Sequence, residues 1–97
     1  MTAYFIAQID VHDPDEYQIC PAGFTTVFQR YGGELLATSK GEATVFEGEW
    51  AHQNTVVMKF PSIEKAQAWY RDPEYNALAK HRYRSTHANL VLVNGVS

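Results

Sequence analysis

The sequence predicts an α+β fold whose elements follow the order strand, helix, strand, strand, helix, strand. Four short segments alternate apolar and polar residues, as half-buried strands do. In two other segments apolar residues recur every three or four positions, as they do along one side of an amphipathic helix. The pairs Asp13-Pro14 and Asp72-Pro73 place a side-chain acceptor at an N-cap and proline at the first helical position. Each pair therefore predicts the start of a helix.

The N-terminal third supplies one strand and one helix. Residues Tyr4–Val11 alternate and form the first predicted strand. A helix is expected from Asp13, and Pro21 and Gly23 inside it should kink or split it. Gly32-Gly33 ends this helix. Its apolar stripe consists of Tyr17, Cys20, Phe24, Val27, Phe28 and Tyr31.

Two strands occupy the middle of the chain. The second strand is predicted over Glu34–Thr38, with a turn at Lys40-Gly41. We expect it to continue over Ala43–Glu47 past a bulge or bend. The third strand covers Thr55–Phe60 and is close enough in the chain to form a hairpin with the second.

The C-terminal third repeats the helix and strand. Pro61-Ser62 opens a short helix, and Asp72-Pro73 opens another that carries Arg82 on its apolar stripe. The last strand covers Ala88–Val93. Because βαβ crossovers are right-handed, both helical segments lie on the same side of the sheet. The sequence thus predicts one domain over residues 1–97, a ferredoxin-like fold with a four-stranded antiparallel sheet.

The two faces of this sheet differ in polarity. The face under the helices is wholly apolar and forms the predicted core: Phe5, Ala7, Ile9, Val11, Leu35, Val56, Met58, Phe60, Leu90 and Leu92. The opposite face mixes apolar residues with Tyr4, Gln8, Asp10, Thr38, Thr55, Lys59 and Asn89. Its apolar members are Ile6, Leu36, Val57, Val91 and Val93. Because a contiguous apolar patch marks an interface or a ligand surface, we expect a homodimer in which two sheets stack face to face and enclose a pocket.

Composition excludes several classes of protein. The 97 residues carry a formal net charge of −3 and are 45% hydrophobic, which is typical of a globular domain and provides no general attraction to nucleic acid or an anionic membrane. The one cysteine excludes an internal disulfide, and no apolar run reaches the length of a membrane span. No signal peptide is recognised at the first residues. A cytoplasmic protein without nucleic-acid or membrane partners is expected.

Few residues in the sequence have a spacing that predicts chemistry. Cys20 lies on an apolar stripe and is interpreted as a core residue. Histidines 12, 52, 81 and 87 lack metal-ligand spacing, so no metal is expected. Glu47 and Glu49 share one side of a strand end, where carboxylates are usually solvated but can perform acid–base work. Arg82 on an apolar stripe needs an anionic partner, which can be Asp10, Glu47 or a ligand carboxylate.

Several segments together resemble a known family. The combination of Glu-Gly-Glu-Trp, Phe-Pro-Ser and Trp-Tyr is similar to the small bacterial family called "domain of unknown function 1330", and the resemblance covers nearly the whole chain. The matching segments are Tyr4–Asp10, Asp13-Pro14 with Tyr17, Tyr31-Gly32-Gly33, Glu47-Gly48-Glu49-Trp50, Val56–Ser62, Ala68-Trp69-Tyr70, Pro73-Glu74-Tyr75, Arg82 and Leu90-Val91-Leu92-Val93.

This resemblance implies a dimeric α+β barrel, the group that includes antibiotic-biosynthesis-type monooxygenases, haem-degrading enzymes and muconolactone isomerase. Haem-degrading relatives use an asparagine on the first strand, a helical tryptophan and a histidine. Gln8, Trp69 and His81 fall at comparable places in this chain. Glutamine in place of asparagine argues against haem oxygenation, so no cofactor is expected.

Three functions follow from these observations. The chain is a ligand-binding dimer, a cofactor-independent monooxygenase- or isomerase-like enzyme, or a structural dimerisation module. An enzyme would use Asp10, Glu47 or His81 as its base. For the ligand-binding alternative we predict a pocket between sheet and helices that takes a small anionic or carbonyl-bearing molecule. Its expected ring consists of Tyr4, Gln8, Asp10, Trp69, His81 and Arg82.

Overall fold

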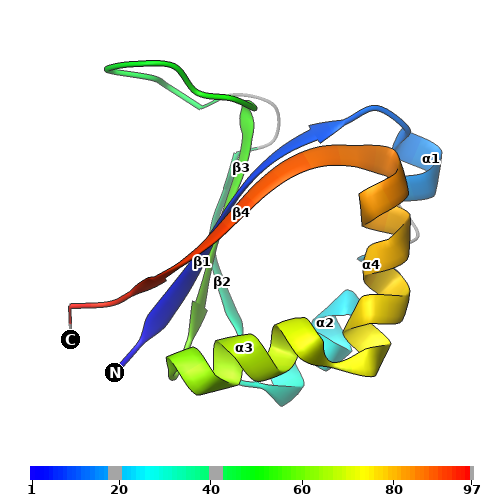
Figure 1. Ribbon diagram of the computed structural model, residues 1–97, viewed down its shortest axis with the longest axis vertical. Coiled ribbons are helices and arrows are strands. Elements are labelled where there is room, and N and C mark those ends of the chain that lie inside the picture. Colours follow the sequence, from blue (N-terminus) through cyan, green and yellow to red (C-terminus); the bar gives the residue numbers. More distant parts are fainter. Residues whose placement is uncertain (18–20, 40–42, 97) are drawn as a thin grey trace.

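A computed structural model describes residues 1–17, 21–39 and 43–96, and it confirms the predicted fold class. Four antiparallel strands form one sheet in the order β2-β3-β1-β4. Helices α2, α3 and α4 lie on one side of this sheet (Figure 1). The elements are β1 (Ala3–Val11), α1 (Pro14–Tyr17), α2 (Pro21–Arg30), β2 (Glu34–Ser39), β3 (Asn54–Phe60), α3 (Ile63–Arg71), α4 (Pro73–Ser85) and β4 (Thr86–Asn94).

The core lies between the sheet and the helices. Alternate residues of β1 are buried there, from Ala3 to Ile9, as the alternation predicts. Trp69 of α3 is 1% exposed and is surrounded by aromatic rings from the sheet and from α2 and α4. Both helical segments are therefore held on the sheet mainly by aromatic packing.

The segment predicted as the first helix is helical over Pro14–Tyr17 and Pro21–Arg30, and α2 continues through Gly23 without a break. α1 ends at Tyr17 and α2 begins at Pro21, while Cys20 lies outside the described residues. α2 ends at the two predicted glycines. Gly32 has a φ of 77°, and the Gly33 N–H donates to the carbonyl of Phe28 at 3.0 Å. This 6→1 bond with a left-handed glycine is a Schellman cap.

Strand β2 departs from its prediction in two ways. The segment 43–47 forms no strand in the described part of the chain, and the Phe46 side chain is 90% exposed. A bulge between Leu35 and Ala37 shifts the register, so Thr38 pairs with Val56 on the helix side instead of lying on the outer face. Leu35 was expected in the core but is 55% exposed because β2 is an edge strand with a neighbour on one side only.

The outer face of the sheet carries an uncovered apolar strip. Ile6 pairs with Val57 on one side and with Val91 on the other, which places the three side chains in one row. Val91 is 53% exposed and Val93 is 41% exposed. The strip alternates with the core residues of the same strands, as predicted. Residues 43–53, which precede β3, project past the sheet on the side away from the helices (Figure 1).

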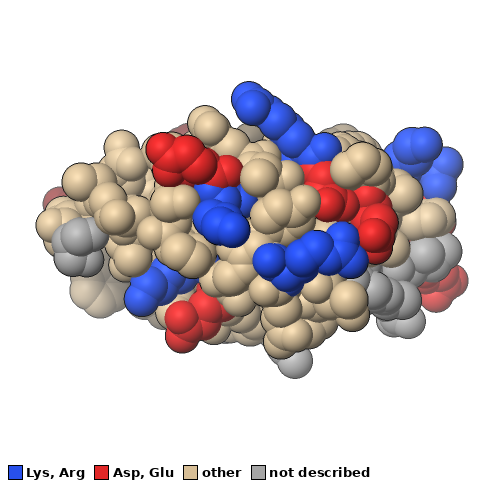
Figure 2. Space-filling view, turned by 90° about the horizontal axis from the view of Figure 1, so that it is seen from below, with Lys and Arg blue, Asp and Glu red and all other residues tan. Residues whose placement is uncertain are grey.

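Charge on the described surface is mixed. Figure 2 shows Lys and Arg side chains interspersed with Asp and Glu over the end of the molecule that holds α3. No described helix combines the length and the apolar character needed to cross a membrane. The mixed charges over the end that holds α3 present no electrostatic field of a single sign (Figure 2).

Side-chain caps begin the helices where the sequence placed them. Asp13 Oδ1 accepts the Glu16 N–H at 3.2 Å. Asp72 Oδ1 accepts the N–H groups of Glu74 and Tyr75 at 2.8 and 3.2 Å. The Tyr31 hydroxyl donates to Asp72 Oδ2 at 2.5 Å, so this carboxylate joins the end of α2 to the start of α4.

The two caps should differ in their contribution to stability. Asp13→Ala should lower the free energy of unfolding by about 0.5–1 kcal/mol because it removes one exposed cap bond. Asp72→Ala should lower it further because it removes two cap bonds and leaves the Tyr31 hydroxyl without its acceptor. Urea denaturation of both variants measures this order. Equal losses would contradict the joining role of Asp72.

Asp72 should also make stability depend on pH. The hydrogen bond from Tyr31 lowers the pKa of the Asp72 carboxyl, with burial acting in the opposite direction and the N–H groups of Tyr75 and Glu74 adding to the lowering. The stabilisation is therefore complete above the unfolded-state pKa of about 3.9 and is lost as pH falls through the lower folded-state pKa. Urea midpoints between about pH 5 and pH 2 should fall more steeply for the native chain than for Asp72→Asn. Parallel curves would contradict this assignment.

Candidate functional site

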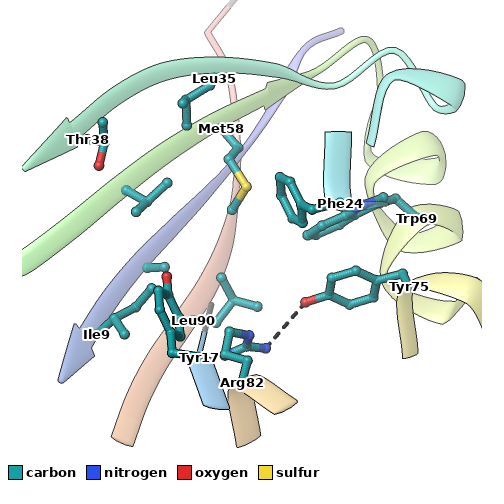
Figure 3. Close-up of a pocket in the computed structure, with 12 residues that line it drawn as sticks. Ile9, Tyr17, Phe24, Leu35, Thr38, Met58, Trp69, Tyr75, Arg82 and Leu90 are labelled. Carbon is teal, nitrogen blue, oxygen red and sulfur yellow. Dashed lines mark hydrogen bonds between the residues drawn. The ribbon is translucent and has the colours of Figure 1, made fainter. Parts of the chain in front are cut away.

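A cavity lies between the sheet and the helices. Its volume is about 210 Å³, and its walls are almost entirely apolar and aromatic. Figure 3 shows these side chains converging from the strands on one side and the helices on the other. The cavity is lined by Ala7, Ile9, Tyr17, Phe24, Leu35, Thr38, Val56, Met58, Trp69, Tyr75, Arg82 and Leu90.

The floor of the cavity is one row of residues across the sheet. Ala7 pairs with Val56 on β3 and with Leu90 on β4, and Val56 pairs in turn with Thr38. Phe5 and Ile9, the neighbours of Ala7 on the same face of β1, have much larger side chains. The methyl group of Ala7 therefore leaves space at the centre of the sheet that a larger residue would fill.

The opposite wall is aromatic. The rings of Trp69 and Tyr75 lie 4.2 Å apart between centroids, and Phe24 meets Trp69 edge-on at 5.9 Å. The indole Nε1 of Trp69 is buried and has no hydrogen-bond acceptor among the described residues. Rigid packed rings of this kind hold the shape of the cavity.

The polar groups gather at one end. Arg82 Nη2 donates to the Tyr75 hydroxyl at 3.3 Å, and Figure 3 shows Tyr17 beside this pair. The guanidinium carbon also lies 4.8 Å from the centre of the Tyr83 ring. Arg82 is partly buried and brings a permanent positive charge to an otherwise apolar space.

Helix α1 is fastened to α4, which positions Tyr17 at the cavity. The Ser85 carbonyl accepts the N–H groups of His12 and Asp13 at 2.8 and 3.2 Å. Glu16 accepts a hydrogen bond from Arg84 Nε at 2.7 Å and lies 3.2 Å from His81 Nδ1. These contacts hold α1 against the C-terminal half of α4.

The structure brings together only two of the six residues that the sequence predicted around the pocket. Trp69 and Arg82 line the cavity. Tyr4, Gln8 and Asp10 belong to the other face of β1, because they alternate with Phe5, Ala7 and Ile9. Their expected orientation between sheet and helices is therefore wrong.

The remaining candidates also lie away from the cavity. His81 is occupied with Glu16 and Arg84 on the side of α4 that meets α1. Glu47 is exposed in the segment between β2 and β3. Asp10 is exposed and pairs with His87 across the β1–β4 ladder.

Sequence reasoning missed most of the cavity wall. Tyr17, Phe24, Met58 and Leu90 were interpreted as core or stripe residues, and Thr38 was placed on the outer face. The available signal was Ala7, a small residue between larger ones on the central strand. The other walls carry no local signal, because they become neighbours only in the folded chain.

The described lining offers binding groups but no carboxylate, imidazole or thiol that could act as a base. It contains one arginine, two tyrosines and one threonine, and no Asp, Glu, His or Cys. No cluster of three or more His, Cys, Asp or Glu side chains suited to a metal ion occurs in the described ranges. Arranged this way, the groups can hold an apolar molecule and donate hydrogen bonds to its polar end.

Comparison with solved structures gives the same fold in proteins of low sequence identity. A protein of unknown function from Rhodopseudomonas palustris is similar with a TM-score of 0.76 and 18% identity, over 99% of this chain and 83% of that one. A dimeric ferredoxin-like protein of unknown function from Jannaschia sp. CCS1 has a TM-score of 0.72 and 12% identity, over 98% and 100%. SnoaB, a cofactor-independent oxygenase from Streptomyces nogalater, has a TM-score of 0.64 and 15% identity, over 99% and 94%. At these identities the likeness concerns the fold.

Sequence comparison gives one family and no individual relative. No curated protein matches the chain. The model of the family described as Domain of unknown function (DUF1330) matches residues 2–96.

Proposed function

The chain belongs to the Domain of unknown function (DUF1330) family, and from this premise we propose that it is a binding protein for a small molecule with an apolar or aromatic body and a carboxylate or carbonyl group. The cavity between sheet and helices is the proposed site. The observation that carries the proposal is Arg82, which lies at one end of an otherwise apolar cavity. Apolar walls supply most of the affinity for such a ligand, and a few polar groups orient it.

The volume of the cavity supports a ligand of about one ring. A dry apolar cavity of about 150 Å³ accommodates benzene. A volume of about 210 Å³ therefore suits a single ring with a small substituent. A substituent at the Arg82 end would meet the guanidinium.

The polar end favours an anion or a carbonyl oxygen. The guanidinium of Arg82 has five N–H donors in a planar fork, one of which is directed to the Tyr75 hydroxyl. Charge-assisted hydrogen bonds to a carboxylate are stronger than neutral ones, and the apolar surroundings strengthen them further. The adjoining tyrosines extend the same donor group.

Binding is favoured over acid–base catalysis because of where the titratable groups lie. The described lining has no carboxylate or imidazole, and the bases that the sequence offered, Asp10, Glu47 and His81, lie elsewhere. A reaction that begins with proton abstraction would need such a group within hydrogen-bond reach of the ligand. Chemical change of a bound compound in air would favour the enzyme alternative.

We also propose that the protein is a homodimer joined through the outer face of the sheet. The apolar strip around Ile6, Val57 and Val91 is uncovered in one chain, and a second copy would bury it. Proteins of the same fold from Jannaschia sp. CCS1 and Bacteroides fragilis are described as dimeric.

Removing the charge of Arg82 tests the ligand site. A library of aromatic and aliphatic carboxylates should raise the melting temperature of the native protein, because a ligand at about 100 times its Kd stabilises by about 2.7 kcal/mol. Arg82→Met should abolish this rise and leave the empty protein folded, whereas Lys80→Met, on an exposed position of the same helix, should retain it. Ala7→Leu, which fills the centre of the floor, should also abolish it.

The opposite result has its own physical meaning. If Arg82 serves only the fold, Arg82→Met should destabilise the empty protein by about 1–3 kcal/mol because the buried Tyr75 hydroxyl loses its donor. A lower melting temperature of the empty variant, together with no carboxylate that stabilises the native protein, would remove the cavity from consideration as a site.

A charge on the outer face tests the dimer. Light scattering at low micromolar concentration should give twice the 11.0 kDa mass of one chain. Val91→Asp should weaken association at least about a hundredfold because it buries an unpaired charge, as should Val57→Asp. Ala77→Asp, on an exposed position of α4, is the control and should leave the dimer intact. A native protein that scatters as one chain would contradict the face-to-face model.

A further inference from the structure

We propose that the ligand site extends past Arg82 into an open groove beside β4, and that the ligand is an elongated molecule with an aromatic end in the cavity and a polar, anionic end in the groove. This inference rests on the proposed function of the cavity. It adds a second subsite and a longer class of ligand.

The cavity and the groove are neighbours that share two lining residues. Arg82 and Leu90 line both the cavity of about 210 Å³ and the groove of about 600 Å³. Arg82 therefore lies at the junction of the two spaces. A molecule whose ring fills the cavity can continue past this junction, and the open groove has more room than the cavity itself.

The contacts of Arg82 bridge the two spaces. Its Nη2 donates to the hydroxyl of Tyr75, which lines the cavity, and its guanidinium lies over the ring of Tyr83, which lines the groove. A planar guanidinium held between these two groups faces both subsites. It is suited to a carbonyl or carboxylate placed between the aromatic and polar parts of the ligand.

The groove differs from the cavity in polarity. Tyr70 and Tyr83 place their hydroxyl oxygens 3.5 Å apart, and their side chains are 37% and 48% exposed. His52, His87 and Asn89 also line it, and its described lining contains no Asp or Glu. The groove therefore offers hydrogen-bond donors and the positive charge of Arg82, and its described lining has no carboxylate that would repel an anion.

The phenol of Tyr83 in the groove is a neutral donor at physiological pH. Burial, followed by the hydrogen bond with Tyr70, raises the pKa of Tyr83 to about 12. A protonated hydroxyl can donate to an anionic group of the ligand, whereas a phenolate would repel it.

Two probes that share a benzoyl unit test the extension by calorimetry. Benzoate fits the cavity alone, and hippurate carries the same unit with an amide and a carboxylate that reach the groove. The native protein should bind hippurate about tenfold more tightly than benzoate, as one added charge-assisted contact provides. The neutral hippuramide should lose most of this advantage.

Variants of the groove assign the gain to its residues. The double variant Tyr70→Phe/Tyr83→Phe should bring the ratio of hippurate to benzoate affinity from about ten to near one, because both hydroxyls are lost while both rings remain. Tyr4→Phe removes a phenol hydroxyl from the other face of the sheet and should leave the ratio unchanged.

The outcomes separate the two proposals. If benzoate binds but hippurate binds no better, or if the double variant keeps the ratio, the extension is overturned and the cavity function stands. If hippuramide equals hippurate, the anionic end is overturned. If no carboxylate binds at all, both proposals fail together.

Discussion

Trp69 is the side chain on which both layers of the molecule depend. The centroid of its ring lies 5.5 Å from that of Phe5 of β1, 5.3 Å from Phe60 of β3, 5.7 Å from Phe28 of α2 and 4.2 Å from the tilted ring of Tyr75 of α4. One buried ring thus sets the distance of α2, α3 and α4 from the sheet. Loss of a buried ring of this size typically costs about 3–5 kcal/mol. Because Trp69 also forms part of the cavity wall, the same packing that stabilises the fold defines the space available to a ligand.

The central strand β1 divides the molecule into two surfaces with separate roles. It pairs with β3 on one side and β4 on the other, so each of its residues belongs to a row across the sheet. The row through Ala7 forms the floor of the cavity, and the row through Ile6 forms the apolar strip of the outer face. Since a strand alternates residue by residue, these rows lie on opposite faces. A second copy bound to the strip would therefore not occupy the cavity.

The fold could be predicted from the sequence because its signals are local. Alternation, Asp-Pro caps and paired glycines each act over a few residues, and the structure places Asp72 and Gly32 as their chemistry requires. The cavity could not be predicted in the same way. A one-residue bulge after Leu35 turns Thr38 to the other face, and the alternation in the sequence contains no sign of it. The empty space follows from the small side chain of Ala7. The predicted ring instead included Tyr4, Gln8 and Asp10, which lie on the outer face of the sheet.

The basic run at the end of α4 shows how helix geometry separates residues that are adjacent in sequence. His81 and Arg84 are three positions apart and share one side of the helix, where both contact Glu16 of α1. Arg82 is rotated by about 100° from His81 and is directed to Tyr75 instead. The sequence predicted an anionic partner for Arg82 and a candidate base at His81, but it contained no sign of the contact with Glu16. In the folded chain His81 and Arg84 fasten α1 over one end of the cavity, and Arg82 places its charge inside. The same run of residues thereby both positions Tyr17 and supplies the group that can orient a ligand, which is why the charged end of the cavity depends on the contact between α1 and α4.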